Sequence, residues 1–480
     1  MEPLFCGIDV GTQGARCAVV AADGAPVGRG ESAFPRVASS LPDGWFEQDP
    51  DDWIAAVRQA LGQALKAVDA RRILATSVTS TSGTLCALDA DHRPLCPAVM
   101  YSDSRSEAEA VEAQQAGGPL TARLGYRFSP SFGLPKILWF RRHRPDLYAR
   151  AASLVSPTDY VIGWLTDSWG RSDQTNVLKF GYDLLEDRWP AFIERELGIE
   201  IGLLPNVQRP GELAGRVTPE RADQTGLPAG TPVAAGMTDG CASQVSSGAA
   251  SPGQYNTTIG TTLVIKGVSE RLTLDPEGRV YCHRHPAGWW LPGGASNTGA
   301  ECLAVEFGEK ETESLSPRAL EGSPTDLIAY PLVGRGERFP FRRPDAEGFL
   351  IGAPRSRQEL FTAYLEGVAC LERLAYDTLA SLGAEIGDVV FSAGGGARSE
   401  AWLQIRADTL NRTVLRPALT GAAMGAAILA ASLAHYDDLA RAARAMVRMD
   451  REVGPRTDFV GRYAEKYQRF TEECSHCGYV

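Results

Sequence analysis

The chain has 480 residues, a length that at about 150 residues per domain predicts two or three domains with large buried cores. Its 44% hydrophobic and 22% charged residues are typical of a globular protein and exclude a disordered, fibrous or membrane-embedded chain. The 48 Lys and Arg against 59 Asp and Glu give a net charge of −11, so neither nucleic acid nor a membrane is an expected partner. A small molecule is expected instead, and an anionic one would need local dipoles or a metal ion to hold it.

The N-terminal residues and the cysteines indicate a cytoplasmic protein. No basic residue precedes Arg16, so the charged start of a secretion signal is not expected. The most apolar stretch, 421–434, is shorter than the roughly 18 residues that cross a bilayer. Ten cysteines lie scattered in apolar stretches, and we expect them to be reduced core thiols. Cys474 and Cys477 stand in a C-terminus that is expected to be frayed, without a second ligand pair for zinc.

Taken in chain order, the predicted elements alternate between strands and helices. Two strands, 5–12 and 16–20, are predicted because apolar runs flank a Gly-Thr turn. A helix is predicted over 53–65, where apolar residues recur every three or four positions behind acidic residues. The further elements are strands at 73–78 and 85–88 and helices from about 106, near 136–140 and near 159–165. This alternation predicts an α/β architecture.

A weak internal repeat suggests a duplicated domain. Residues 254–265 again have the pattern of a strand, a Gly-Thr turn and a strand, and Gly260 lies about half the chain length beyond Gly11. A domain boundary is predicted near residue 250, beside a Gly- and Pro-rich turn. The alternative is coincidence, because Gly-Thr turns are common in hairpins.

The first Gly-Thr turn carries groups that can hold a phosphate, because backbone N–H groups and the Thr12 hydroxyl meet there. Asp9 precedes the turn and could hold the hydrated Mg²⁺ of a nucleotide, or simply cap the turn amides. No lysine follows a glycine, and neither His-Arg-Asp nor Asp-Phe-Gly occurs in the chain. The P-loop and protein-kinase schemes of nucleotide binding are therefore excluded.

Two later segments are candidates for ligand contact. Glycines 394–396 stand between an apolar strand at 389–393 and a helical pattern that includes Trp402, so backbone there could approach a ligand closely. The pattern is not Gly-x-Gly-x-x-Gly, which disfavours a dinucleotide-binding fold. Asp239 follows a strand at 231–236 and starts a helix, where it could accept a proton, cap the helix, or do both.

In this order, these segments resemble the FGGY family of carbohydrate kinases over nearly the whole chain. The landmarks are Gly-Trp-Phe-Glu-Gln-Asp-Pro at 44–50, Tyr-Ser-Asp-Ser-Arg at 101–105, Gly-Met-Thr-Asp-Gly at 236–240 and Leu-Glu-Gly-Val-Ala at 365–369. The resemblance implies an α/β fold of two actin-like, ribonuclease H-like domains flanking a deep cleft. It implies a sugar-binding domain over 1–250 and an ATP-binding domain over 251–480.

The resemblance also implies roles for single residues. Asp239 would be the catalytic base, and Asp9 would organise Mg²⁺, both lying beside the sugar. Thr12 and Thr261 would face the phosphates. The further residues implied in binding ATP are Gln13, Gly260, Gly395, Gly396, Ser399 and Trp402. Gln13 departs from the family pattern, in which Ser is usual.

Within the family, the chain resembles the D-ribulose kinase branch most. The stretches that carry this likeness are 14–16, 172–183, 293–299 and 336–341. Xylulose kinases typically have Gly-Gln-Met-His where this chain has Ser-Thr-Ser-Gly at 80–83, and Ser82 is the leading candidate for a sugar contact. The sequence thus predicts ATP- and Mg²⁺-dependent phosphorylation of a terminal hydroxyl of a ketopentose, with D-ribulose preferred. The alternatives are D-xylulose or another sugar or polyol, and a non-catalytic ATP-binding protein; a monomer and a homodimer both stay open.

Overall fold

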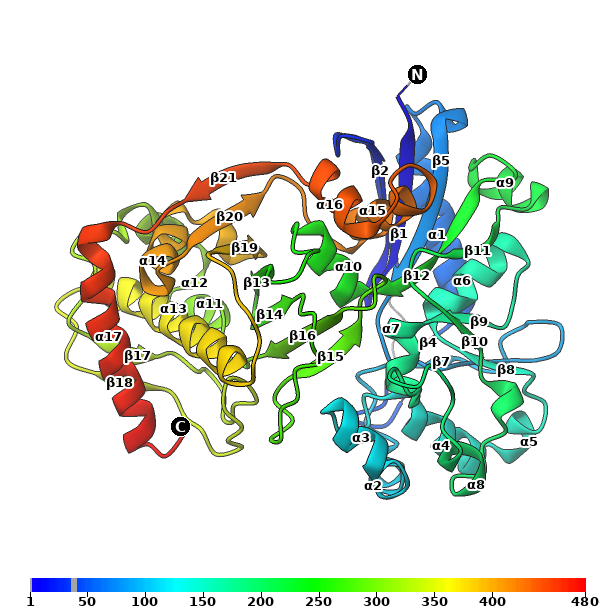
Figure 1. Cartoon of the computed structure of the whole chain (residues 1–480), viewed down its shortest axis with the longest axis horizontal. Helices are drawn as coiled ribbons and strands as arrows, with labels where there is room; N and C mark the ends of the chain where they lie inside the picture. The colour runs from blue at the N-terminus through cyan, green and yellow to red at the C-terminus, as the bar shows by residue number, and fades with distance from the viewer. Residues whose placement is uncertain (1, 36–40) are drawn as a thin grey trace. The chain divides into compact units, whose positions relative to one another are not determined.

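In the computed structural model, which describes residues 2–35 and 41–480, the chain divides into two units (Figure 1). Unit 1 comprises Met1–Ser246, His283–Gly288 and Leu419–Val447. Unit 2 comprises Ser247–Cys282, Trp289–Ala418 and Arg448–Val480. The chain first changes unit after Ser246, close to the expected boundary at 250. It then returns to unit 1 twice, at His283–Gly288 and at Leu419–Val447, which a single boundary does not describe.

Unit 1 is built on a six-stranded sheet whose spatial order is β11-β12-β5-β1-β2-β3. Its strands are β1 (Leu4–Val10), β2 (Gly14–Ala21), β3 (Pro26–Ala33), β5 (Ile73–Ser80), β11 (Leu213–Arg216) and β12 (Pro232–Thr238). The first three strands form an antiparallel meander, and β5 runs parallel to both β1 and β12. The register pairs Ser80 with Val10 and with Thr238, so three neighbouring parallel strands end at one edge of the sheet. Loops at such an edge commonly hold ligands.

The two faces of β1 pack against different helices. Ile8 and its even-numbered neighbours share a core cluster with Trp53 and Val57 of α1 (Pro50–Leu65). Helix α1 begins where Asp49 accepts a hydrogen bond from the Asp51 N–H, with Pro50 at the first position. Because side chains alternate across a strand, the odd-numbered residues of β1 face the opposite side of the sheet.

Helix α15 (Ala422–Ala434) covers that opposite face at very short range. A Cβ added to Gly7 of β1 would lie 1.9 Å from the Ala423 carbonyl oxygen. A Cβ added to Gly425 would lie 1.9 Å from the Ala242 carbonyl oxygen of α10 (Asp239–Ser246). The small residues of the apolar stretch 421–434 therefore allow close packing of backbone against backbone. This packing explains why residues 419–447 belong to unit 1 and not to the domain predicted over 251–480.

The other elements of unit 1 surround this sheet. Three pairs of short strands are β4 (Glu47–Gln48) with β7 (Ala98–Val99), β6 (Cys86–Leu88) with β8 (Ser153–Val155), and β9 (Arg171–Asp173) with β10 (Asn206–Gln208). The helices are α2 (Glu107–Ala116), α3 (Gly118–Leu124), α4 (Gly133–His143), α5 (Pro145–Tyr148), α6 (Pro157–Thr166), α7 (Gln174–Val177), α8 (Phe192–Arg195), α9 (Pro219–Thr225) and α16 (Leu439–Met446).

A pH-dependent stability is expected from Asp159 in helix α6. This buried carboxyl has its pKa raised from 3.8 to about 7, first by burial and second by the charge of Asp173. Because the folded state then binds the proton more tightly than the unfolded state, stability from this group is present below about pH 4 and is lost as pH rises to about 7. We therefore compare the free energy of unfolding of Asp159→Asn with that of the wild type. This difference should shift in favour of the variant between pH 4.5 and pH 8, by at most about 4 kcal/mol.

Urea unfolding at several pH values measures this difference. Asp146→Asn, at an exposed position of α5, is the control and should follow the wild-type profile. A constant difference between Asp159→Asn and the wild type across this pH range would show that Asp159 does not titrate there.

Unit 2 repeats the hairpin-and-parallel-strand arrangement in a seven-stranded sheet of order β15-β16-β14-β13-β19-β20-β21. These strands are β13 (Tyr255–Ile259), β14 (Leu263–Gly267), β15 (Tyr281–Arg284), β16 (Trp290–Ala295), β19 (Val389–Ala393), β20 (Thr413–Pro417) and β21 (Met449–Val453). A separate pair is β17 (Ile328–Tyr330) with β18 (Phe349–Ile351). The helices are α11 (Glu301–Glu306), α12 (Gly308–Leu315), α13 (Arg357–Ser381), α14 (Glu400–Leu410) and α17 (Thr457–His476).

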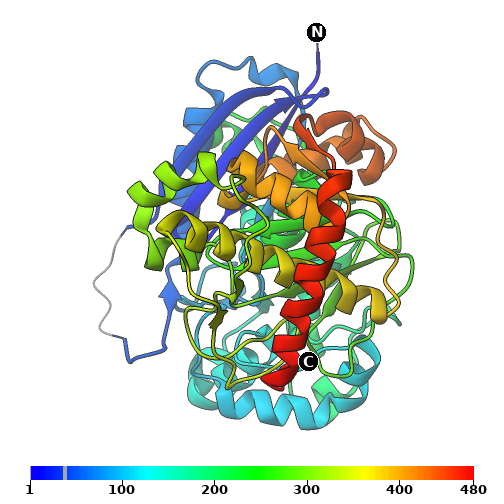
Figure 2. The same cartoon turned by 90° about the vertical axis from the view of Figure 1, so that its left-hand side faces the viewer.

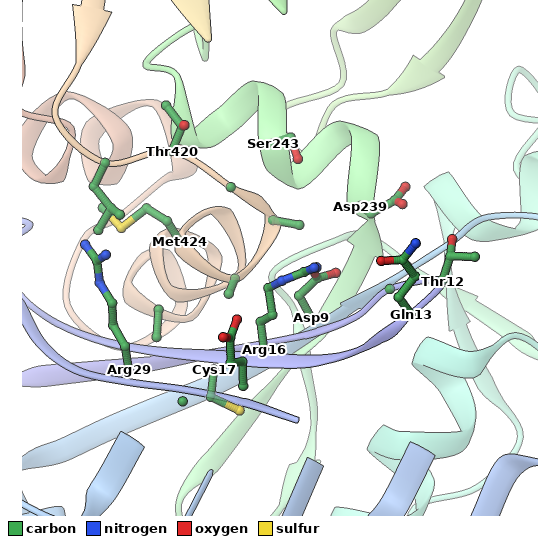
Figure 3. Close-up of a pocket in the computed structure, with 18 of the residues that line it drawn as sticks. Asp9, Thr12, Gln13, Arg16, Cys17, Arg29, Asp239, Ser243, Thr420 and Met424 are labelled. Carbon is green, nitrogen blue, oxygen red and sulfur yellow. The ribbon is translucent and has the colours of Figure 1, made fainter. Parts of the chain in front are cut away.

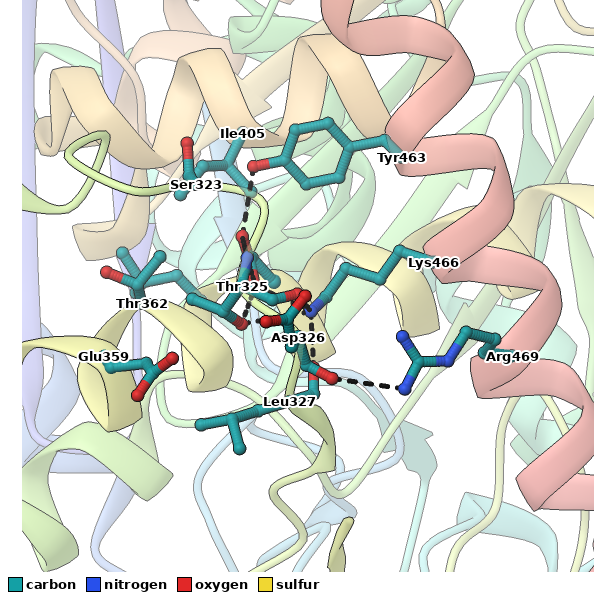
Figure 4. A network of polar contacts seen from close by, with 12 residues as sticks. Ser323, Thr325, Asp326, Leu327, Glu359, Thr362, Ile405, Tyr463, Lys466 and Arg469 are labelled. Carbon is teal, nitrogen blue, oxygen red and sulfur yellow. Dashed lines mark hydrogen bonds and ion pairs between the residues drawn. The ribbon is translucent and has the colours of Figure 1, made fainter. Parts of the chain in front are cut away.

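The C-terminal helix α17, in red facing the viewer in Figure 2, is anchored to the core of unit 2 by a buried ion pair. Lys466 Nζ lies 2.8 Å from Glu366 of α13, and both side chains are at most 5% exposed. The Thr325 N–H and hydroxyl and the Tyr463 hydroxyl also donate to Glu366. Figure 4 shows Thr325, Tyr463 and Lys466 of this network, with Tyr463 and Lys466 both coming from α17. The expectation of a frayed C-terminus was wrong, because this network holds α17 and because Cys474 is buried in a hydrophobic cluster with Tyr330 and Phe470.

Candidate active site

A cavity of about 1110 Å³ in unit 1 collects most of the residues that the sequence predicts for that half of the chain. It is lined by the β1–β2 turn, by the first turns of α10 and α15, and by part of β3. Asp9, Thr12, Gln13 and Asp239 all line it (Figure 3). Asp9 is the next-to-last residue of β1, the turn follows β1, and Asp239 follows β12, so the shared strand edge brings these residues together.

The Gly-Thr turn is exposed at its tip and fixed at its base. The Gly11 N–H donates to the Gly14 carbonyl over 3.0 Å, which closes the turn, while Thr12 and Gln13 are exposed. The Thr12 hydroxyl lies 3.4 Å from the Tyr101 hydroxyl. The tip therefore presents backbone N–H groups and a hydroxyl to the cavity, which suits the oxygens of a phosphate.

Asp9 is a buried carboxylate with an unsatisfied oxygen. Its Oδ2 lies 3.6 Å from Nη1 of Arg16, and its buried Oδ1 has no hydrogen-bond partner among the residues that the structure describes. The pKa of Asp9 is raised to about 7, first by burial and second by the charge of Asp239, against the opposing effect of Arg16. An unpartnered carboxylate oxygen near a second carboxylate favours a divalent cation, and Mg²⁺ prefers one or two carboxylates together with water and phosphate oxygens. Asp9 thus fits the predicted metal role.

Clusters of three or more His, Cys, Asp and Glu side chains suited to a metal ion are absent from residues 2–35 and 41–480. In the same residues, no helix is both long enough and apolar enough to cross a membrane.

Asp239 stands at the junction of β12 and α10. Its Oδ1 accepts a hydrogen bond of 2.6 Å from the Gly240 N–H, so one carboxylate oxygen is held by the start of its own helix. The bond fixes the side chain at the cavity wall, where a carboxylate can accept a proton. This bond goes to the N–H of the next residue, not to the second or third N–H of the helix as a cap bond does, and it is compatible with the predicted role of Asp239 as a base.

Ser82 follows β5 at the same strand edge but is not among the residues that line the cavity. The neighbouring Ser80 hydroxyl lies 2.6 Å from that of Thr158, and the Thr81 hydroxyl lies 3.3 Å from that of Thr84. Those hydroxyls are buried within unit 1, whereas Ser82 is half-buried. Ser82 is therefore the most exposed of these hydroxyls, and its contact with a sugar stays a prediction.

Lys179 is a residue beside Ser82 whose role sequence reasoning missed. Its Nζ donates to the Ser82 carbonyl over 3.3 Å and lies 5.6 Å from the centre of the Phe132 ring, and the residue is only 9% exposed. A buried ammonium with one long hydrogen bond has donors left for sugar hydroxyls. In the sequence this lysine stands out only as part of the stretch 172–183 that carries the family likeness, because nothing local connects it with Ser82.

In unit 2, the second Gly-Thr turn and the glycine loop lie at neighbouring strand ends. The turn joins β13 to β14, and β13 pairs in parallel with β19, which leads into the glycines. Gly394 has a φ of +84°, and an added Cβ would lie 2.4 Å from the Ile259 carbonyl oxygen, so only glycine allows the loop to pass this close. Gly260, Thr261, Gly395 and Gly396 are therefore brought to one edge of this sheet.

Two other predicted residues of unit 2 have structural contacts. The Ser399 hydroxyl accepts from the Trp402 N–H over 3.2 Å, which caps α14, and lies 2.8 Å from the Ser316 hydroxyl. Trp402 is 2% exposed, and its indole N–H donates to the Leu365 carbonyl over 3.0 Å. Trp402 thus lies in the core behind the glycine loop, where it can support the loop through packing.

Glu337 was also missed as a site-supporting residue. This carboxylate is 3% exposed and accepts from the Ser296, Thr298 and Tyr330 hydroxyls over 2.8, 3.0 and 2.9 Å, and from the Asn297 N–H over 2.6 Å. The segment that it holds continues directly into Ala300, whose N–H donates to the Gly260 carbonyl over 2.8 Å. Glu337 therefore fixes the loop against the second Gly-Thr turn.

Comparisons with known proteins agree with this arrangement. The N-terminal domain of the FGGY family of carbohydrate kinases matches residues 4–246, and its C-terminal domain matches residues 256–434. A xylulose kinase of Streptomyces coelicolor is 32% identical over 98% of this chain and 95% of its own length. A xylulose kinase of Bacillus subtilis is 26% identical over 98% of this chain and 96% of its own length.

The fold is matched by a solved structure. The crystal structure of a xylulose kinase from Brucella ovis covers 99% of both chains, with a TM-score of 0.88 and 29% identity. The predicted mixed α/β, two-domain fold of this family is confirmed. The chain belongs to the FGGY family of carbohydrate kinases and is an ATP-dependent sugar kinase.

Proposed function

We propose that this kinase transfers the γ-phosphoryl group of ATP to a terminal hydroxyl of a ketopentose, with D-ribulose preferred. The observation that carries the proposal is the cavity that brings Asp9, Thr12 and Asp239 to one strand edge. A carboxylate that can accept the hydroxyl proton and a turn that can hold phosphate oxygens are what this reaction needs. A cytoplasmic location stays a prediction. The oligomeric state stays open between a monomer and a homodimer.

In the proposed mechanism, Asp239 accepts the proton of the attacking sugar hydroxyl while its Oδ1 stays oriented by the Gly240 N–H. The N–H groups and hydroxyl of the Thr12 turn stabilise the charge on the transferred phosphoryl group. Asp9 would hold Mg²⁺, which when bound neutralises charge on the phosphate oxygens. In unit 2, the backbone N–H groups of the Thr261 turn and of the glycines 395–396 would suit phosphate oxygens of ATP.

The preference for D-ribulose is supported by the segment 80–83. This segment offers the half-buried Ser82 hydroxyl, and the buried Lys179 ammonium donates to the Ser82 carbonyl beside it. These groups differ from the Gln and His typical of xylulose kinases. D-Xylulose is the second candidate, because the curated relatives named above are xylulose kinases. A screen of ketopentoses, ketohexoses and polyols for ADP release tests the whole proposal. Absence of ADP release with every sugar would instead favour a non-catalytic ATP-binding protein.

We predict a higher kcat/KM for D-ribulose than for D-xylulose. The two sugars differ only in configuration at C3, so one misplaced hydroxyl decides the preference. A buried polar group left unpaired costs about 1–3 kcal/mol, which corresponds to roughly 5- to 150-fold in kcat/KM. Ser82→Ala should reduce this ratio, whereas Ser314→Ala on the exposed face of α12 should not. Equal efficiencies, or a preference for D-xylulose, would reject D-ribulose as the preferred substrate.

A further inference from the structure

Gln48 connects the first Gly-Thr turn to the core of unit 1. It lies in the two-residue strand β4, within the family landmark 44–50. Its side-chain Nε2 donates to the Thr12 carbonyl over 2.7 Å, and its Oε1 accepts from the Trp53 indole N–H over 2.8 Å. Trp53 is fully buried in the cluster beneath the sheet. The Gln48 amide is therefore a bridge between an immobile core side chain and the exposed tip of the turn.

The orientation of this amide is determined by its two partners. The Thr12 carbonyl can only accept a hydrogen bond, and the indole N–H of Trp53 can only donate one. A flipped amide would place oxygen against oxygen on one side and N–H against N–H on the other. The bridge thus holds the Thr12 carbonyl in one direction.

The direction of the Thr12 carbonyl determines where the next N–H points. The peptide between Thr12 and Gln13 is planar, and in a trans peptide the carbonyl of one residue and the N–H of the next point in opposite directions. Holding the Thr12 carbonyl towards Gln48 therefore aims the Gln13 N–H away from Gln48. A correctly aimed backbone donor matters most where negative charge develops in a transition state.

We propose that Gln48 is a positioning residue that orients the Thr12–Gln13 peptide so that its N–H donates to the transferred phosphoryl group. The proposal rests on the proposed function, which puts this turn beside that group. It also gives a physical role to the Gln of the landmark at 44–50, because Glu or Met of similar size cannot donate to the Thr12 carbonyl at neutral pH.

The test is Gln48→Glu, which keeps an oxygen for the Trp53 N–H but removes the donor to the Thr12 carbonyl. We expect kcat to fall by about 10- to 100-fold, because removing one such transition-state donor outright typically costs about 10²–10³-fold. The melting temperature, the KM for ATP and the Kd for the sugar should stay near wild type. Gln59→Glu, on α1, is the matched control, since its side chain only accepts, from the Ser32 hydroxyl over 2.8 Å.

A pH profile separates positioning from a general structural role. At low pH the carboxyl introduced by Gln48→Glu becomes protonated and can donate to the Thr12 carbonyl again. The ratio of its kcat to that of the wild type should therefore rise as pH falls from 8 to 5.5, whereas the same ratio for Gln48→Met should stay low and constant. A flat ratio for Gln48→Glu would overturn the proposal, and so would a drop in kcat that only follows a loss of folded protein.

Two further variants distinguish failure of this inference from failure of the proposed function. Thr12→Ala and Asp239→Asn should both lower sugar-dependent ADP release if the turn and the base act as proposed. If neither variant lowers ADP release, the proposed site is wrong. If both lower it while Gln48→Glu has the activity of Gln59→Glu, the site stands and the role of Gln48 is wrong.

Discussion

Asp239→Asn is expected to lower kcat by about 10²–10⁴-fold, the usual cost of losing a general base. Asparagine has nearly the shape of aspartate and can still accept from the Gly240 N–H, so α10 should begin at the same residue. Only the ability to accept the sugar proton is lost. The KM for ATP and its binding constant should therefore change little, which steady-state kinetics and calorimetry measure separately.

Asp438→Asn is the matched control for this variant. Asp438 likewise accepts from a backbone N–H at the start of a helix, since its side chain caps α16 through the Arg441 N–H over 2.7 Å, outside the cavity. Its replacement by Asn should leave kcat near wild type. Near-normal turnover of Asp239→Asn would remove Asp239 from the mechanism, whereas a parallel loss in both variants would indicate a helix-capping effect.

The local patterns predicted the elements that carry the site. Apolar runs beside the Gly-Thr turns predicted both hairpins, and the spacing from Trp53 predicted α1. These succeeded because strand and helix periodicities depend on neighbouring residues only. The joint placement of Asp9 and Asp239 followed from the resemblance, and the parallel register of β1, β5 and β12 explains it physically.

The contacts that the sequence did not predict join residues far apart in the chain. Gln48 donates a hydrogen bond to Thr12, 36 positions away, and Lys179 donates one to Ser82, 97 positions away. Glu337 accepts hydrogen bonds from the loop at 296–298, about 40 positions away. No local period encodes such pairs, since each depends on how complete elements pack. The return of 419–447 to unit 1 is a similar case, because a stretch of small apolar residues shows that close packing is possible but not which backbone it meets.

Arg406→Met is expected to destabilise the protein by about 3–5 kcal/mol, the cost of leaving a buried charge without its partner. Arg406 of α14 and Glu372 of α13 are both fully buried and form a bidentate pair, with Nε–Oε2 and Nη2–Oε1 distances of 2.7 and 2.8 Å. Arg406 also donates to the Ser392 hydroxyl, at the end of the strand that leads into the glycine loop. Urea unfolding measures the loss.

Two comparison variants identify the cause of that loss. Arg318→Met breaks a pair with Glu321 in which both side chains are more than half exposed, at 65% and 61%, and should change the stability far less than Arg406→Met, because water screens an exposed pair. The double variant Arg406→Met with Glu372→Met removes both buried charges and should recover much of the stability lost in the single variant, because apolar side chains can fill the same volume without desolvating an ion. A single-variant loss below about 1 kcal/mol would contradict the expected cost of the unpaired Glu372. A double variant no more stable than the single one would show instead that the pair contributes through its geometry, by holding α13, α14 and the end of β19 together below the glycine loop.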